Sequence, residues 1–237
     1  MSLHYQMVSE EVKSTLVQLM KIKELAPFRL VGGTALALQL GHRSSVDIDL
    51  FAGGGAPQPH ELGEILKLYF PKNFQITRFQ RFGIAAFIHN VKVDLYDWKV
   101  PFSSDPVVID SIRMASVEDI FASKCEALLG RRVEKDFSDL SEIIRHVHLD
   151  KLFDTLIKRY PYLSKSAVVA ILLKPSAFER DLSIKYAQGK SWDGYQQTLT
   201  RAIAQYEDDL INSKINEMAQ REKKIQELIN QKKNKKS

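Results

Sequence analysis

Residues 28–51 read FRLVGGTALALQLGHRSSVDIDLF, and this stretch decides the fold of the N-terminal half. Its first four residues predict a short strand, and the Gly32-Gly33 pair behind them predicts a tight turn. Residues 34–40 are rich in Ala and Leu, which favour a helix. Residues 46–51 then alternate apolar and acidic side chains, as a half-buried strand does. The stretch therefore predicts a strand, a turn, a helix and a second strand in succession.

Two aspartates, Asp47 and Asp49, are unusual in such a strand, because strands are poor in aspartate. Side chains two residues apart point to the same face of a strand, so the two carboxylates lie together and repel. Asp94, in the later strand-like run VKVDLYDW, joins them if its strand lies beside the first. Carboxylates are the hard oxygen ligands that suit Mg²⁺, which also binds substrate phosphates. The three acids predict a metal site of the kind used for phosphoryl and nucleotidyl transfer.

The Gly32-Gly33-Thr34 turn supplies a complementary phosphate-binding element. Glycine lets the backbone approach a phosphate closely, and the start of the following helix presents free N–H groups and a positive dipole end. Arg43 and Ser45 lie in the loop before the acidic strand, where the planar guanidinium of Arg43 suits a phosphate. We expect these five residues to bind the substrate. From the residues alone, nucleotidyl transfer and plain loop and strand structure explain the motifs about equally well.

The rest of the chain divides into a mixed half and a helical half. In the first half, the spacing of apolar residues predicts helices at 8–25 and 60–70 and strands at 74–80, 83–89 and 91–98. From Ser116 onward the patterns are helical, at 117–129, 135–147, 151–160, 165–173, 176–188 and 192–230. We predict an α+β fold with a mixed-sheet core domain at 1–115, followed by an all-helical domain at 116–237.

The composition is that of an ordinary globular protein, with 44% hydrophobic and 27% charged residues. No apolar run approaches the roughly 18 residues of a membrane span, and no signal peptide is expected. A single cysteine, Cys125, excludes an internal disulfide or a cysteine-based zinc site within one chain, which favours the cytoplasm. The net charge of +5 resides in residues 221–237, which hold seven Lys or Arg and two Glu. This Lys-rich tail is either a solvated helix end or an arm for nucleic acid.

The run LVGGTALALQLGHRSSVDIDLF, residues 30–51, resembles the nucleotidyltransferase toxins of the AbiEii/AbiGii type. These toxins belong to type IV toxin–antitoxin and abortive-infection systems, within the wider DNA-polymerase-β-like nucleotidyltransferase superfamily. The resemblance implies a nucleotidyltransferase core in which Asp47, Asp49 and Asp94 bind the catalytic metals.

The resemblance also implies two catalytic residues in the helical half. One is a lysine in a helix, matched by Lys124, and the other is an aspartate in a motif like R-D-x-x-D-L, matched by Asp136. Lys135 stands where that motif usually has arginine. We expect Lys124 to bind nucleotide phosphates and Asp136 to act as a catalytic or base-like residue. The alternatives are a lysine whose stem lies on the core and an acid that favours the start of its helix.

The activity that the resemblance implies is Mg²⁺-dependent transfer of a nucleoside monophosphate from an NTP to an acceptor hydroxyl. The acceptor would be RNA such as tRNA, or a protein side chain, and a cognate antitoxin would be a partner, with no membrane involved. Two other interpretations stay open. One is a nucleotidyltransferase that acts on a small molecule, such as an antibiotic, and the other is a catalytically silent module that binds nucleotide or RNA.

Two further features have simple interpretations. His42, next to Arg43, is expected to be an exposed loop residue, and contact with a substrate is the alternative. A regular apolar spacing in the last helix predicts either packing on its own domain or a partner-binding coiled coil. That stripe comprises Ile211, Ile215, Met218, Ile225 and Ile229.

Overall fold

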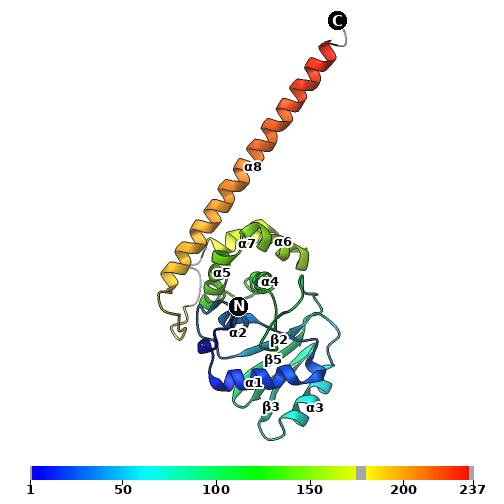
Figure 1. Ribbon diagram of the computed structural model, residues 1–237, viewed down its shortest axis with the longest axis vertical. Coiled ribbons are helices and arrows are strands. Elements are labelled where there is room, and N and C mark those ends of the chain that lie inside the picture. Colours follow the sequence, from blue (N-terminus) through cyan, green and yellow to red (C-terminus); the bar gives the residue numbers. More distant parts are fainter. Residues whose placement is uncertain (1, 175–179, 235–237) are drawn as a thin grey trace.

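The computed structural model describes residues 2–174 and 180–234. One sheet, layered with helices, forms the body, and a long C-terminal helix projects away from it (Figure 1). The strands are β1 Arg29–Val31, β2 Ile48–Ala52, β3 Phe74–Gln80, β4 Gly83–Ile88, β5 Val91–Asp97, β6 Val107–Ile109 and β7 Ile112–Met114. The α-helices are α1 Glu10–Lys21, α2 Gly32–Leu40, α3 Pro59–Tyr69, α4 Val117–Ala127, α5 Glu134–His146, α6 Leu149–Arg159, α7 Lys165–Leu172 and α8 Trp192–Asn234.

The central strands of the sheet bring two of the predicted metal ligands together. The strand order is β3-β4-β5-β2-β1-β7-β6. β2 and β5 run parallel, whereas β1 is antiparallel to β2 and β4 is antiparallel to β5. The register sets Asp49 of β2 directly opposite Asp94 of β5. The predicted α+β fold with a mixed sheet is therefore confirmed.

Local chemistry explains several element boundaries. Gly41 follows α2 in the left-handed conformation, with φ of 63°, as a helix-ending glycine does. Pro59 opens α3, where its missing N–H is harmless. His89 and Asn90 both have positive φ and join β4 to β5 in a tight hairpin of the type that matches strand twist.

The short hairpin β6–β7 was not expected from the sequence. Asp110 and Ser111 form its turn with φ of 50° and 65°, and β7 adds to the sheet by pairing parallel with β1. Strands of three residues are too short for apolar alternation to be recognised. The hairpin therefore depends on a neighbouring strand more than on its own pattern.

The predicted helix at 176–188 is wrong over residues 180–188, and its residues 176–179 lie outside the described part. The backbone of this segment pairs with the loop after α2 instead of with itself. The Ser44 N–H donates to the Lys185 carbonyl at 2.9 Å, and the Ala187 N–H donates to the His42 carbonyl at 2.9 Å. These tertiary hydrogen bonds replace the intrahelical ones.

A continuous apolar core joins the sheet half to the helical half. Leu36 of α2, Phe121 of α4 and Phe137 of α5 are fully buried in the same cluster. In Figure 1, α4 to α7 gather at one end of the sheet, with α1 on its face. The sheet ends at Met114 and α4 begins at Val117. A domain boundary near residue 115 stays a prediction, because the core crosses it.

The helix α8 is anchored at its start and free over the rest of its described length. Tyr195, Leu199 and Ile203 are buried against the body, whereas every described side chain from 207 to 227 is exposed. Packing of the apolar stripe on its own domain is wrong for its described members, Ile211, Ile215, Met218 and Ile225, while the Ile229 side chain lies outside the description. No helix in the described ranges has both the length and the apolar character that crossing a bilayer requires.

Candidate active site

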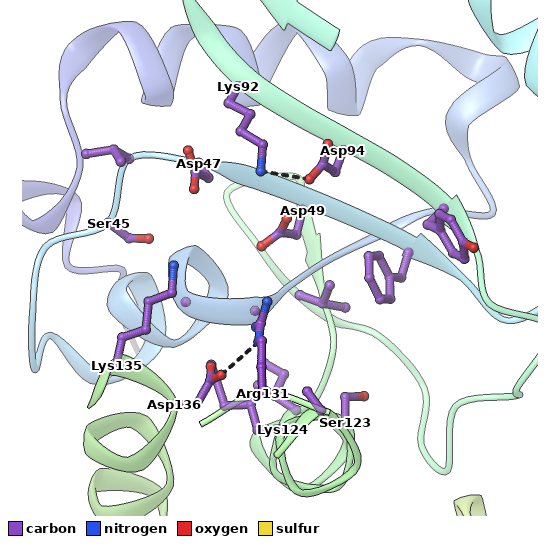
Figure 2. A pocket seen from close by; sticks show the side chains of 18 of the residues that line it. Ser45, Asp47, Asp49, Lys92, Asp94, Ser123, Lys124, Arg131, Lys135 and Asp136 are labelled. Atoms are coloured by element: carbon purple, nitrogen blue, oxygen red, sulfur yellow. Dashed lines mark hydrogen bonds and ion pairs between the residues drawn. The ribbon is translucent and has the colours of Figure 1, made fainter. Parts of the chain in front are cut away.

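A cleft of about 880 Å³ opens between one face of the sheet and the helices α4 and α5 (Figure 2). This volume is in the usual range for sites that bind small ligands. Residues from separate parts of the chain line the cleft together. They include all but one of the predicted site residues: Gly32, Gly33, Arg43, Ser45, Asp47, Asp49, Asp94, Lys124 and Asp136.

The three acids come from two strands and the loop before them. Asp49 and Asp94 lie side by side on β2 and β5, while Asp47 lies in the loop just before β2 and not within the strand as predicted. Burial, followed by the neighbouring charge of Asp94, raises the pKa of Asp49 to about 6. A cation among these carboxylates would offset both the cost of burying the charge of Asp49 and its repulsion by Asp94.

The ammonium of Lys92 provides a positive charge at this cluster. Its Nζ lies 3.0 Å from Asp94 Oδ2, as Figure 2 shows. Burial acts to lower the pKa of Lys92, but the hydrogen bond to Asp94 and the nearby charges of Asp94, Asp47 and Asp49 raise it overall. Sequence reasoning missed Lys92, although its position two residues before Asp94 places both side chains on one face of β5.

The residues present fit a divalent cation with oxygen ligands. Asp94 Oδ1 is buried and has no hydrogen-bond partner, so one carboxylate oxygen remains to be satisfied. Three carboxylates in an open cleft form the donor set that Mg²⁺ prefers. Over the described residues, no group of three or more His, Cys, Asp or Glu side chains is already drawn together around a metal position. Binding would therefore require small movements of Asp47, Asp49 and Asp94 toward a shared ion.

The start of α2 approaches the acids closely. Gly32 and Gly33 are the first two residues of the helix, and not a separate turn before it. Gly32 has φ of +67°, and a Cβ at this position would lie 2.6 Å from Asp49 Oδ2. A Cβ on Gly33 would lie 2.4 Å from the Arg43 Nη2. Glycine is needed at both positions, because the side chains of Asp49 and Arg43 lie directly against the backbone there.

Thr34 holds the loop behind the cleft. Its side chain is buried, and it is the one predicted substrate-binding residue that does not line the cleft. Its hydroxyl hydrogen-bonds the Asp47 carbonyl and lies 2.8 Å from Ser45 Oγ. The structure therefore gives Thr34 a positioning role for the loop that carries Asp47.

Beneath the cleft lies a network of buried charges centred on Asp139 of α5. The Arg43 guanidinium donates to both carboxylate oxygens, at 2.6 Å from Nε and 2.8 Å from Nη2. The Lys124 Nζ lies 2.7 Å from Asp139 Oδ2, and the His42 Nε2 lies 2.6 Å from Oδ1. Burial opposes ionisation of Asp139, but Arg43 and then Lys124 hold its pKa well below the usual range.

The second buried acid, Asp136, pairs with the same lysine. The Lys124 Nζ donates to Asp136 Oδ1 at 2.8 Å, and the Arg131 Nε donates to Oδ2 at 3.1 Å. Although burial opposes ionisation, Lys124 and then Arg131 lower the pKa of Asp136. An arginine therefore contacts Asp136, but it is Arg131 and not the residue at position 135, where the family motif usually has arginine.

The structure changes the expected surroundings of three residues. Arg43 is held by Asp139 on the cleft floor, so its predicted contact with phosphate would use its remaining N–H groups. Asp136 carries two cationic partners and is not a free base. His42 is buried against Asp139, so its expected exposure is wrong. Asp139 lies three residues after Asp136, at the second aspartate of the motif R-D-x-x-D-L, and this position was the signal for it.

Aromatic rings form the other end of the cleft. Phe51 and Trp98 are stacked, with centroids 6.4 Å apart and an interplanar angle of 19°. Tyr96 lies 5.6 Å from Trp98 and completes this wall, while Ile120 and Tyr160 from the helical half also line the cleft. The site therefore has a charged end at the start of α2 and an aromatic end further along β2 and β5.

Two sequence comparisons identify relatives of the chain. Residues 15–85 match the family model described as "Nucleotidyl transferase AbiEii toxin, Type IV TA system". An uncharacterized protein of Aquifex aeolicus (strain VF5) is 26% identical over 178 residues, which make up 70% of this chain and 82% of that protein. The resemblance predicted from residues 30–51 is confirmed by the family match.

Solved structures with little sequence identity share the fold. MenT4, a nucleotidyltransferase toxin from Mycobacterium tuberculosis H37Rv, is similar with a TM-score of 0.55 at 14% identity, covering 82% of this chain and 81% of that one. JHP933 from Helicobacter pylori is similar with a TM-score of 0.52 at 20% identity, covering 90% of this chain and 98% of that one. Both the sheet half and much of the helical half are therefore shared with these proteins.

Proposed function

We propose that this chain, a nucleotidyltransferase whose residues 15–85 match the AbiEii toxin family, moves a nucleoside monophosphate from an NTP to an acceptor hydroxyl. The acceptor hydroxyl releases its proton to solvent as its oxygen bonds to the α-phosphorus, the bond from that phosphorus to the bridging oxygen breaks, and pyrophosphate leaves with that electron pair. The observation that carries the proposal is the meeting of three acids with the start of α2 in one cleft.

The charged end of the cleft suits a triphosphate beside a metal. Mg²⁺ held by Asp47, Asp49 and Asp94 would activate the acceptor oxygen and stabilise the leaving group. The free N–H groups of Gly32 and Gly33 and the positive end of α2 favour the phosphate oxygens.

The side chains around this end complete the binding of phosphate. The Ser45 hydroxyl lies at the same edge of the cleft and suits hydrogen bonding to a phosphate oxygen. Lys124 and Arg43 add positive charge from the floor, where Asp136 and Asp139 fix their position and offset part of that charge. Preorganised charge of this kind stabilises a transition state without costly rearrangement.

The aromatic end suits the planar base of the nucleotide. Stacking on an aromatic ring is worth about 1–3 kcal/mol per base and works for any base. The stacked pair Phe51 and Trp98 stands on the same sheet face as Asp49 and Asp94. A nucleotide with its phosphates at α2 would therefore extend its base toward these rings.

The physiological setting follows from the toxin class. A type IV toxin implies a cognate antitoxin, and we propose an RNA acceptor such as tRNA. The Lys-rich end of α8 is consistent with an approach to RNA, because phosphate contacts come mainly from Lys and Arg. A buried, unpaired Cys125 is consistent with action in the cytoplasm.

The direct test incubates the full chain with each α-labelled NTP, Mg²⁺ and total RNA. Label is expected to enter RNA with wild-type protein and with Asp154→Asn, a change at an exposed ion pair on α6. Asp47→Ala is expected to transfer none. Failure of wild-type protein to consume any NTP, with RNA or with protein acceptors, would refute the proposal.

The aromatic wall leads to a prediction on nucleotide affinity. Trp98→Ala is expected to weaken NTP binding about tenfold, since one stacking surface is lost. Phe87→Ala removes an exposed aromatic ring on β4, outside the cleft, and is expected to bind like wild type. Calorimetric titration with a non-hydrolysable NTP measures both, and equal affinities would contradict the placement of the base.

A second prediction separates the two reasons for glycine at position 32, which are its left-handed backbone and its close approach to Asp49. Gly32→Ala and Gly55→Ala both put a side chain on left-handed backbone, at φ of +67° and +79°, and each is expected to lose about 1–2 kcal/mol of stability. Only at Gly32 does the new methyl meet Asp49, since nothing lies within 4 Å at Gly55. Gly32→Ala alone is therefore expected to lose activity, about 10²-fold. Urea unfolding and NTP consumption give the two readouts, and equal activities would contradict the close approach to Asp49.

A further inference from the structure

Lys92 is placed to interact with the whole acidic cluster. Its side chain leaves β5 on the same face as Asp94, and its Nζ lies 3.0 Å from Asp94 Oδ2. Figure 2 shows the ammonium between Asp47 and Asp94, above Asp49. The side chain is 46% exposed, so it is free to turn toward solvent on its flexible stem.

Three other cations that line the cleft are paired with acids outside the cluster. Lys124 is shared between Asp136 and Asp139, Arg43 donates to Asp139, and Arg131 donates to Asp136. Lys92 is the cation that directly contacts a member of the cluster formed by Asp47, Asp49 and Asp94, within the described part of the chain. It therefore supplies charge where a divalent ion is expected to sit.

We propose that Lys92 is an internal counter-ion that competes with the divalent metal for the acidic cluster. An ammonium and a divalent ion cannot both stay within about 4 Å of the same carboxylates without strong repulsion. Metal entry must then displace Lys92, which lowers the affinity for metal alone. Nucleotide phosphates offer the displaced ammonium a new partner. Metal that binds together with nucleotide therefore loses less affinity to this competition. Lys92 acts here as a positioning residue, and the inference rests on the proposed metal site.

The chain contains a close control for Lys92. Lys99 Nζ lies 2.5 Å from Asp97 Oδ2, and its side chain is 48% exposed. The acid of this pair is also on β5, and the two residues are also separated by two positions, but neither lines the cleft. Lys99→Met removes the same charge from a comparable pair without touching the cluster.

The test is titration of the full chain with Mn²⁺ alone, with the free ion followed by electron paramagnetic resonance. Lys92→Met and Lys92→Gln are expected to bind Mn²⁺ about tenfold more tightly than wild type, because one nearby positive charge is gone. Lys92→Arg and Lys99→Met are expected to bind like wild type. With a non-hydrolysable NTP present, the tenfold difference is expected to shrink.

The outcomes separate this inference from the proposed function. Wild-type affinity in both neutral variants, with Asp49→Asn failing to bind, would overturn the role of Lys92 and leave the metal site standing. Absence of Mn²⁺ binding in wild type and in the Lys92 variants alike would overturn the metal site itself. Tighter binding in Lys99→Met as well would show a general charge effect, and that result would also overturn the inference.

Discussion

Asp49→Asn is expected to lower nucleotidyl transfer by at least about 10³-fold, because a metal ligand contributes several kcal/mol to stabilising the transition state. The fold is expected to survive. Burial and the charge of Asp94 already disfavour ionised Asp49, so a neutral side chain of the same shape removes an unfavourable interaction. The metal-free variant is therefore expected to unfold at the wild-type temperature or above it.

Two measurements check this result together. Turnover of labelled NTP gives the loss of activity, and thermal unfolding with and without Mg²⁺ gives the loss of metal-dependent stabilisation. Asp154→Asn, at an exposed pair on α6, is the control for both. A variant that keeps full activity would show that the chemistry does not take place at the acidic cluster.

Asp139→Asn is expected to cost about 3–5 kcal/mol of unfolding free energy, since it leaves buried cations without their partner. Arg43 loses both carboxylate contacts, and Lys124 keeps only Asp136. The same substitution at Asp154 is expected to cost less than about 1 kcal/mol, because its pair with Lys165 is exposed. Urea unfolding at neutral pH measures both changes.

The effect of Asp139 also has an expected pH dependence. The pKa of Asp139 in the folded protein lies well below its unfolded value of about 4. Ionised Asp139 therefore contributes its full stabilisation at all pH values above the unfolded pKa. The contribution is lost only as pH falls through the folded pKa. The difference between wild type and Asp139→Asn is thus expected to stay constant from pH 7 to about pH 5 and to shrink below pH 4. A difference that already fades at pH 6 would contradict the buried pairing.

Much of the site was predictable because its key residues obey local rules. A strand places every second side chain on one face, which is why Asp94 was predicted to join Asp47 and Asp49 if the two strands lie side by side. Gly32-Gly33 followed by a helix-forming run predicts exposed backbone N–H groups at the start of a helix. Gly41 likewise predicted the end of α2, and Pro59 and Pro71 predicted the two ends of α3.

Other features depend on contacts between distant parts of the chain. Asp139 is separated from Arg43 by 96 positions, and nothing in the spacing of either residue predicts that they meet. A helix was predicted to include residues 180–188, yet the backbone of this segment forms hydrogen bonds with the loop after α2. Lys92 reads as an ordinary exposed strand residue until its strand lies against the acids.

The sequence alone determined which side chains share a face of a strand and where most helices and strands begin and end, and it predicted that three acids and the Gly32-Gly33 pair lie at one site. Only the tertiary structure decided which cations pair with which acids, that Thr34 is buried behind the cleft, and that α8 is exposed over residues 207–227. The reason is physical. Periodicity and capping depend on neighbours a few residues away, whereas burial and ion pairing depend on how whole elements pack together.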